Sequence, residues 1–393
     1  MKTNLHIRNL NDKDVQVPHP DLEALQQLWA VNQPFDDKGT ERLFVDAVRQ
    51  VTQYHYDRNT FYKTWLDTNR FQPQSIQTIR DIAQIPFIHA NFYKTHVVMS
   101  AKDEDLVLHL TSSGTSGQKS QMFFDAWTIF SSDKSADVQF GYYGLISDEP
   151  ANFLLYSYEP AENVNVGTLR TRQMMRRYAK ENELVYALKY TGKGHEFDLF
   201  GCINALLRFE KEGLPVRLLG FPAFLYFTLE RMKDMGYPPL QLNPASLVMM
   251  GGGWKGFVDK QLTPAEFRAY INERLGLPEC CCHESYGAVE HGVAYIDCPN
   301  HHFHVPVYSR AFIRDVRTLE TVPFGVAGFL NVVSPMNTAV PVVSLLLGDM
   351  AVMHEGKTCG CGVQTPYFEI LGRAGVSKNR SCAIAASELL KKK

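Results

Sequence analysis

The sequence contains no apolar run long enough to cross a lipid bilayer. Hydrophobic residues make up 45% of the 393 positions, but polar side chains interrupt them before the roughly 18–20 consecutive apolar residues that a membrane-spanning helix needs. The formal net charge is only −2, so the composition does not favour binding to nucleic acid or to an anionic membrane surface. Residues 1–8 lack the apolar segment of a secretory signal peptide. These absences predict a cytoplasmic protein with no membrane span and no nucleic-acid partner.

Cysteine is too sparse for a disulfide framework. The chain has 8 cysteines among 393 residues, and three of them are consecutive, at positions 280–282. Disulfide-dense scaffolds are typical of short secreted domains, so free thiols in a reducing compartment are the better interpretation. Roles as metal ligands or as nucleophiles therefore stay open for individual cysteines.

Three regions differ in their pattern of apolar residues. Residues 1–105 place apolar side chains at helical spacing and are predicted to form a mostly helical amino-terminal part of one large domain. Residues 106–371 alternate short apolar runs, such as 216–220, with amphipathic segments, such as 264–275. That alternation predicts an α/β core of stacked, mostly parallel sheets flanked by helices. Residues 372–393 form a short carboxyl-terminal tail.

One polar segment stands between two apolar runs near the start of the α/β region. It consists of hydroxyl and glycine residues followed by a lysine: Thr111, Ser112, Ser113, Gly114, Thr115, Ser116, Gly117 and Lys119. Glycines let successive backbone N–H groups point inward, and hydroxyls and an ammonium add donors, which suits a polyphosphate. The glycine spacing does not match the Walker loop. A polar turn between two strands is the alternative interpretation.

This segment resembles the phosphate loop of adenylate-forming enzymes, the superfamily of acyl- and aryl-CoA ligases, adenylation domains and luciferase. The form found here looks closest to that of LuxE-type acyl-protein synthetases. One departure is that Lys119 follows Gly117 by two places rather than three, which makes its role less certain than that of the loop. The resemblance implies the fold of the adenylate-forming large domain over residues 106–371.

Two later segments match the superfamily pattern in order. A strand-like run ends in Gly251, Gly252 and Gly253, where the superfamily lays backbone against adenine, and glycine permits such close approach. Tyr286, Gly287 and Glu290 match a Tyr-Gly-x-x-Glu pattern. The resemblance implies that Tyr286 stacks near adenine and that Glu290 binds Mg²⁺, a hard cation that prefers oxygen ligands. A surface turn is the alternative for this short pattern taken alone.

Two dipeptides complete the pattern. Asp349, in Gly-Asp, matches the carboxylate that accepts hydrogen bonds from the ribose hydroxyls, and Arg373, in Gly-Arg, matches a guanidinium that reaches ribose or phosphate. Each dipeptide is common by itself, but four motifs in this order are improbable by coincidence. A full ligase continues past Gly-Arg into a mobile domain with a catalytic lysine, and we expect that domain to be absent here.

The later cysteines suggest a metal site. Cys359 and Cys361 lie in a glycine-rich turn, and Cys298 is followed by three histidines. Cysteine and histidine at such spacing can bind tetrahedral zinc. The set resembles a zinc site of phenylacetate-CoA ligase-like members, which implies Cys298, His304, Cys359 and Cys361 as ligands, with His301 as an alternative. Free thiols in a loop are the other interpretation. Four protein ligands would make the zinc structural.

Cys382 lies in the carboxyl-terminal tail in a different setting. Ser381 can cap a short helix, and Lys378 and Arg380 are close in sequence, which favours the thiolate. A small buried residue on an amphipathic helix is the alternative. In acyl-protein synthetases a similar segment carries the acylated cysteine, so the resemblance implies that Cys382 accepts the acyl group.

Together these features predict an AMP-forming acid–thiol ligase. The resemblance implies that ATP and Mg²⁺ activate a carboxylic acid, expected to be a fatty acid, as acyl-AMP. In that first step Glu290, through Mg²⁺, and Lys119 stabilise charge on the phosphates. The acyl group then passes to Cys382 as a thioester and onward to a partner acyl reductase. The alternatives are an acyl- or aryl-CoA ligase and a non-catalytic nucleotide-binding subunit. The sequence does not specify the acyl chain or the oligomeric state.

Overall fold

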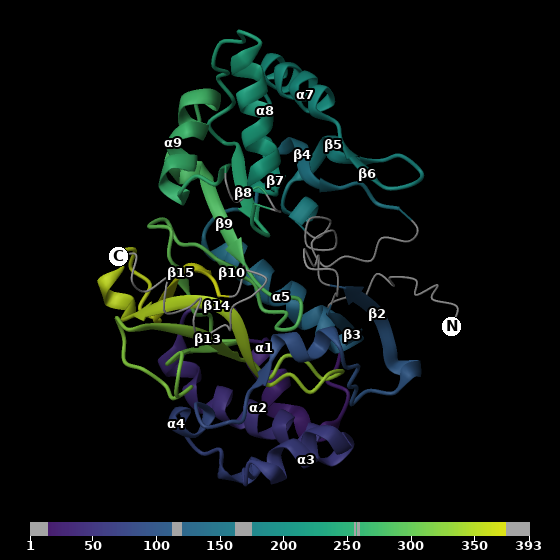
Figure 1. The fold of residues 1–393 in the computed structure, drawn as a ribbon, viewed down its shortest axis with the longest axis vertical. Coiled ribbons are helices and arrows are strands. Elements are labelled where there is room, and N and C mark those ends of the chain that lie inside the picture. Colours follow the sequence, from purple (N-terminus) through teal and green to yellow (C-terminus); the bar gives the residue numbers. More distant parts are fainter. Residues whose placement is uncertain (1–14, 112–119, 162–174, 255–256, 258–259, 375–393) are drawn as a thin grey trace. The chain divides into compact units, whose positions relative to one another are not determined.

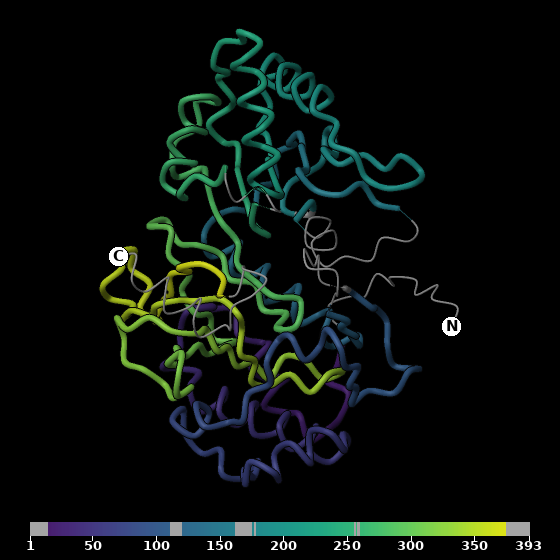
Figure 2. Tube along the Cα trace, viewed as in Figure 1, coloured from purple at the N-terminus to yellow at the C-terminus, as the bar shows by residue number. Residues whose placement is uncertain are grey.

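The computed structural model describes residues 15–111, 120–161, 175–254, 257 and 260–374. Figure 1 shows the ribbon and Figure 2 the Cα trace. The chain forms two compact units. Unit 1 comprises the described residues of 1–111, 118–142 and 287–393, and unit 2 comprises those of 143–286. Among the helices in the described ranges, none combines the length and the apolar character that crossing a bilayer requires.

The helices of unit 1 come mostly from the amino-terminal part of the chain. Residues 37–68 form two helices, because Asn59 adopts an extended backbone and its side chain caps the second one by accepting from Tyr62 N at 2.9 Å. Residues 73–82 form only a 3-10 turn and one short helix. The helices are α1 (Glu23–Trp29), α2 (Asp37–Arg58), α3 (Thr60–Thr68), α4 (Ile79–Ile82) and α5 (Ala126–Tyr142).

The main sheet of unit 1 is antiparallel except for one short parallel pairing. Its order is β11-β15-β14-β13-β12, and β1 pairs with β14 in parallel. The expectation of mostly parallel sheets therefore does not extend to this one, whose strands follow one another through short connections. The strands are β1 (Ile88–His89), β11 (Phe303–His304), β12 (Arg310–Arg314), β13 (Ala327–Val333), β14 (Ser344–His354) and β15 (Tyr367–Arg373).

Hydrogen bonds join the amino-terminal helices to the carboxyl-terminal strands of unit 1, which lie together in the trace of Figure 2. The fully buried His55 of α2 bonds through Nδ1 to Ser100 Oγ at 2.7 Å and through Nε2 to the carbonyl of Asn337 at 2.9 Å. Trp29 Nε1 donates to the carbonyl of Ser131 at 2.8 Å. These bonds connect residues far apart in sequence, so residues 15–105 form part of the same core as the sheet.

The two strands of a hairpin flank the polar segment that the sequence analysis identifies as a phosphate-loop candidate. β2 (Leu106–Thr111) and β3 (Gln121–Asp125) pair antiparallel. Residues 112–119 lie between these strands and outside the described residues. At the end of β3, Asp125 is buried; its Oδ1 accepts from Thr128 N at 2.8 Å and its Oδ2 accepts from Thr338 Oγ1 at 2.6 Å. Asp125 thereby caps α5 and connects the hairpin to the loop before β14.

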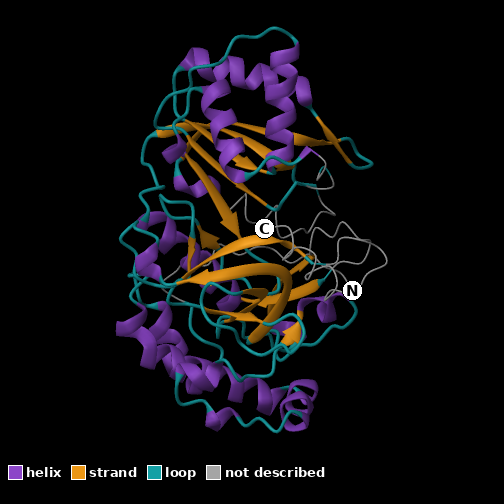
Figure 3. Ribbon diagram, turned by 60° about the vertical axis from the view of Figure 1, so that its left-hand side comes forward, coloured by secondary structure: helices purple, strands orange, loops and turns teal. Residues whose placement is uncertain are grey.

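Unit 2 is an α/β layer structure, as the sequence predicts. Its sheet has the order β9-β8-β7-β4-β5-β6, parallel except for the pairing of β5 with β6. Helices α7, α8 and α9 cover one face of the sheet, as Figures 1 and 3 show. Successive right-handed crossovers toward one edge place all three on that face. The strands are β4 (Pro150–Tyr158), β5 (Lys180–Tyr190), β6 (His195–Phe197), β7 (Val216–Gly220), β8 (Leu247–Gly251) and β9 (Cys282–Tyr286).

The helices of unit 2 bury apolar side chains against the parallel strands. They are α7 (Leu199–Glu212), α8 (Pro222–Asp234) and α9 (Pro264–Leu275). Leu206 of α7, Leu225 of α8 and Ile271 of α9 share one core with Leu218 of β7 and Val248 of β8. α9 begins with a capping box formed by Thr263 and Glu266, and both α7 and α9 end at a glycine in the left-handed conformation.

Candidate functional site

The Tyr-Gly-x-x-Glu segment spans the junction between the units. Tyr286 is the last residue of β9 in unit 2, and Gly287 begins the last segment of unit 1. After Gly287 the chain turns, with the N–H groups of His291 and Gly292 both donating to the carbonyl of Ala288 at 3.0 and 3.1 Å. Glu290 lies in this turn and is buried within unit 1.

The carboxyl group of Glu290 lies in an environment that disfavours its charge. Burial raises its pKa above the ordinary value, and this outweighs the nearby Ser120 side chain and the charges of Lys94 and Arg373, which lower it. Ser120 directly follows residues 112–119 and is itself buried. Ser120, the first described residue after the polar segment, therefore lies near the carboxylate that the sequence assigns to Mg²⁺. A divalent cation would supply the missing positive charge, so the donor chemistry fits that ion.

The neighbours of Glu290 in the chain are tightly held. His291 is buried; its Nε2 lies 2.9 Å from Tyr295 Oη, which lies 2.7 Å from Ser309 Oγ. Burial lowers the pKa of His291 to about 3, so the ring is neutral at physiological pH. Gly292 has a φ of +76°, and a Cβ there would lie 2.0 Å from Met336 Cε. The buried His291 ring and the left-handed backbone of Gly292 thus fix the turn that carries Glu290.

Asp349 and Arg373 come together through strand pairing. In the antiparallel β14–β15 pair, Asp349 is the register partner of Arg373. A Cβ on Gly348 would lie 4.0 Å from Arg373 Nε, so this side chain extends along the Gly-Asp dipeptide. Asp349 lies inside β14, because the strand continues through the Gly-Asp dipeptide to His354. The positive charge of Arg373 also lowers the pKa of the Glu290 carboxyl group. The motifs that contain Glu290, Asp349 and Arg373 therefore lie together within unit 1.

Glycines of unit 2 occupy the position that the sequence predicts. β8 ends at Gly251, and Gly252 and Gly253 follow with φ values of +82° and +70°. Only glycine adopts such a backbone readily. The two glycines therefore let the strand end in a sharp turn, and they leave the backbone there uncovered by side chains. Tyr286 ends the neighbouring strand β9, which pairs in parallel with β8. Parallel pairing places the ends of both strands at the same edge of the unit 2 sheet.

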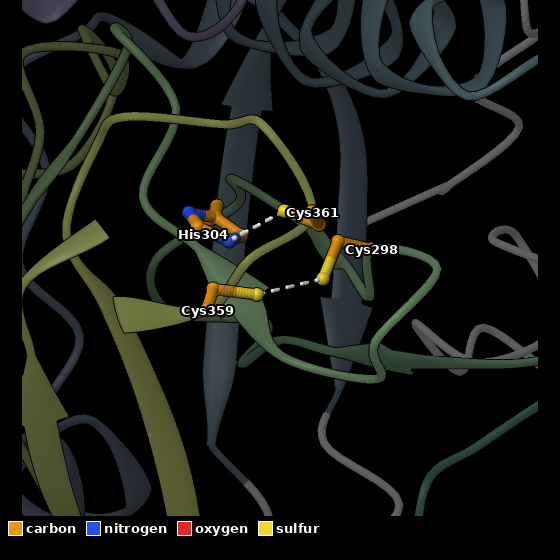
Figure 4. A group of neighbouring side chains, drawn as sticks. All are labelled: Cys298, His304, Cys359 and Cys361. Carbon is orange, nitrogen blue, oxygen red and sulfur yellow. Dashed lines mark hydrogen bonds between the residues drawn. The ribbon is translucent and has the colours of Figure 1, made fainter. Parts of the chain in front are cut away.

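Three cysteines and one histidine form a compact cluster in unit 1. One atom from each of Cys298, His304, Cys359 and Cys361 could bind a metal, and these four atoms lie within 4.8 Å of one another. The side chains point toward a common centre in Figure 4. Cys298 Sγ lies 3.5 Å from Cys359 Sγ, and His304 Nε2 lies 3.3 Å from Cys361 Sγ. Sulfur ligands of a tetrahedral zinc ion would be separated by about 3.8 Å.

The orientation of the cluster suits a metal ion. His304 Nδ1 donates to the carbonyl of Thr365 at 2.7 Å, which leaves Nε2 unprotonated and directed toward Cys361. Burial is the main cause that raises the pKa of the Cys298 and Cys359 thiols. Gly360 has a φ of +77°, so the glycine-rich turn can present both of its thiols to one centre. His301, the alternative ligand, instead places Nδ1 3.0 Å from Asp297 Oδ2.

Some residues near these sites were not predicted from the sequence. His302 Nδ1 lies 3.1 Å from Cys359 Sγ, and its ring stacks on Tyr367 with centroids 4.3 Å apart. Lys94 and Ser120 both lower the pKa of the Glu290 carboxyl group. Ser120 follows the polar segment directly, and this adjacency could have predicted that it lies near the site. Nothing in the sequence around Lys94 distinguishes it, since its proximity to Glu290 depends on the fold.

Several predicted site residues cannot be placed. Ser112 to Gly117, Lys119 and Cys382 lie outside the described residues, and Thr111 is described only as the last residue of β2. Their roles stay predictions from the sequence.

Solved structures with a similar fold define the class of protein. The open conformation of 2-hydroxyisobutyryl-CoA ligase in complex with 2-HIB-AMP and CoA superposes with a TM-score of 0.66, over 95% of this chain and 83% of that chain, at 13% sequence identity. The chain therefore has the fold of adenylate-forming ligases, as the resemblance predicts.

The family follows from the sequence comparison. The family model described as acyl-protein synthetase, LuxE, matches residues 27–391. The chain belongs to this family, whose members are ligases. It is 24% identical to the long-chain-fatty-acid–luciferin-component ligase of Aliivibrio fischeri over 353 residues, which cover 88% of each chain. The corresponding ligase of Vibrio harveyi is 24% identical over 343 residues, covering 87% of this chain and 86% of that one.

The environment of Glu290 predicts a stability effect that depends on pH. Because its pKa is raised, the folded chain retains this proton to higher pH than the unfolded chain does, and the stability contribution is lost as pH rises through the folded pKa. Glu290→Gln removes the cost of burying a charge. We expect this variant to unfold at a higher temperature than the unchanged protein at pH 8, with a smaller difference at pH 5. Exposed Glu104→Gln is the matched control. A gain for Glu290→Gln that is equal at both pH values would contradict the electrostatic explanation.

Proposed function

We propose that the protein activates a long-chain fatty acid with ATP and transfers the acyl group to its own Cys382. Membership of the acyl-protein synthetase family supports the ligase chemistry, and the names of the relatives support a fatty acid as substrate. The observation that carries the proposal is the convergence in unit 1 of Glu290, Ser120 and Arg373, with Asp349 paired to Arg373. A buried carboxylate beside the end of a phosphate-loop sequence is what a metal–nucleotide substrate requires.

Each residue would contribute a distinct contact to the nucleotide. Asp349 accepts hydrogen bonds from the ribose hydroxyls, and Arg373 donates to ribose or phosphate. The loop from Thr111 to Gly117 and Lys119 donates to the phosphates. Gly251, Gly252 and Gly253, with Tyr286 and Gly287, contact adenine. Glu290 holds Mg²⁺, which when bound neutralises charge on the phosphate oxygens.

The reaction would proceed in two displacements. A carboxylate oxygen of the fatty acid attacks the α-phosphorus of ATP, the bond to the β-phosphate oxygen breaks, and pyrophosphate leaves. Donors aimed at the phosphate oxygens stabilise the charge that develops. The Cys382 thiolate then attacks the carbonyl carbon of the acyl-AMP, and AMP leaves with the bonding electron pair. We propose that the resulting thioester delivers the acyl group to a partner acyl reductase.

The first displacement is tested by exchange of labelled pyrophosphate into ATP. We expect exchange to require a long-chain fatty acid, and Glu290→Gln to slow it by about 100-fold or more because charge stabilisation at the phosphates is lost. Glu104→Gln should exchange at the unchanged rate. Binding of ATP without any acid-dependent exchange would indicate a non-catalytic nucleotide-binding subunit. Formation of an acyl-CoA by this chain alone would indicate a CoA ligase instead.

The second displacement is tested by intact mass spectrometry after incubation with ATP and fatty acid. The unchanged protein should gain one acyl group that hydroxylamine removes, whereas Cys382→Ser should gain none and keep its pyrophosphate exchange. The exposed Cys280→Ser variant is the matched control and should be acylated normally. Hydroxylamine-sensitive acylation that persists in Cys382→Ser would show that another nucleophile accepts the acyl group.

We further propose that Cys298, His304, Cys359 and Cys361 bind one structural zinc ion. The two loops that supply these ligands are held side by side by the antiparallel pairing of His304 with Tyr367. Cys298 lies in the connection from β10 (Tyr295–Ile296) to β11, and His304 is the last residue of β11. Cys359 and Cys361 lie in the connection from β14 to β15. Four protein ligands leave no open coordination position, so the metal would stabilise the fold rather than take part in the reaction.

Metal analysis tests the zinc proposal. The purified protein should contain about one zinc per chain, and Cys359→Ser should lose most of it and unfold at a lower temperature, because metal binding contributes to folding free energy. Cys281→Ser, which removes a buried thiol outside the cluster, should retain the metal. A stoichiometry near zero in protein purified without chelators would refute the site.

A further inference from the structure

A short 3-10 turn that carries a lysine begins beside the Gly-Asp dipeptide of the unit 1 sheet. The turn is η3 (Ala90–Lys94), which follows β1 directly. β1 pairs in parallel with β14, and its last residue, His89, is the partner of Leu346. Because both strands run in the same direction, η3 begins at the level where β14 continues into Gly348 and Asp349. The register therefore places Lys94 near the proposed nucleotide contacts of unit 1.

Aromatic packing holds this turn rigidly. Tyr93 is buried, and its hydroxyl donates to the carbonyl of Pro341 at 3.0 Å. The ring of Phe92 lies between Phe61 and His96, with centroid distances of 4.8 and 4.3 Å and nearly parallel planes on both sides. The backbone that carries Lys94 is therefore already ordered before a ligand binds, which removes one part of the cost of binding.

The ammonium group of Lys94 is not bound directly by any described residue. Among the described residues it makes no salt bridge and no hydrogen bond, and its side chain is only partly exposed. The positive charges of Lys94 and Arg373 both lower the pKa of the Glu290 carboxyl group. The charge of Glu290 in turn raises the pKa of the Tyr93 phenol. Two cations therefore face one buried carboxylate. A carboxylate, a divalent cation and an unpaired ammonium form a suitable set for a phosphate chain, since ammonium binds phosphate as a point charge.

We propose that Lys94 binds the β- and γ-phosphates of ATP, the part that leaves as pyrophosphate. This assignment rests on the proposed function and adds a residue from outside the phosphate-loop sequence. The leaving pyrophosphate gains charge as its bond to the α-phosphorus breaks, so a fixed cation there stabilises the transition state more than the bound substrate. Arg373, the register partner of Asp349, binds the ribose end of the same nucleotide.

Calorimetric titration of the full-length protein tests the role of Lys94. MgATP, magnesium pyrophosphate and AMP are each titrated into the unchanged protein and the variants Lys94→Gln and Lys94→Arg. Loss of a charged contact to phosphate should weaken binding of MgATP and magnesium pyrophosphate by about 10-fold or more in Lys94→Gln. AMP binding should change by less than about twofold, and Lys94→Arg should recover most of the affinity.

Lys102→Gln is the matched control, since it removes the same charge from an exposed lysine that pairs with Glu104. The thermal unfolding midpoint of each variant shows that it is folded. Unchanged binding of MgATP by Lys94→Gln overturns the role of Lys94, and so does an equal loss of affinity for AMP. Failure of the unchanged protein to bind MgATP would instead overturn the proposed function, so the two failures are distinguishable.

Discussion

The pairing of β14 with β15 is the constraint on which the rest of the candidate site depends. One end of this antiparallel pair places Asp349 opposite Arg373, and the connection at its other end carries Cys359 and Cys361. On the same side as β15, β14 pairs with β1 at Leu345 and Leu346, and this pairing orients the turn that carries Lys94. A shift of one residue in this register would turn every side chain of the strand to the opposite face. The proposed nucleotide contacts and the proposed zinc site are therefore fixed by the same backbone hydrogen bonds.

Electrostatics explain why the fold tolerates Glu290 in a buried position. A carboxylate excluded from water destabilises the folded chain unless a compensating charge is present. Lys94 and Arg373 compensate only in part, since burial still raises the pKa of Glu290. The remaining cost would be relieved by a bound cation. On this account the folded chain keeps a locally unfavourable charge because the ligated state uses it, which is a common feature of active sites.

Local patterns in the sequence predicted the motifs, and long-range pairing decided how they come together. The flanking strands of the polar segment and the glycines after β8 follow from apolar runs and glycine position. The break between α2 and α3 at Asn59 is not evident from the sequence, because helical periodicity continues on both sides of it. Lys94 could not be found from its neighbours, because its closeness to Glu290 arises from the β1–β14 register. The antiparallel sheet of unit 1 was likewise missed, since apolar runs do not reveal strand direction.

The central claim is that the carboxylate of the substrate attacks the α-phosphorus of ATP. The most direct test uses a long-chain fatty acid whose carboxylate carries heavy oxygen, with the released AMP and pyrophosphate analysed by mass spectrometry. Attack at the α-phosphorus transfers one carboxylate oxygen to phosphorus, so AMP should carry one heavy oxygen and pyrophosphate none. Heavy oxygen in inorganic phosphate, with ADP as the other product, would mean attack at the γ-phosphorus and would contradict the account.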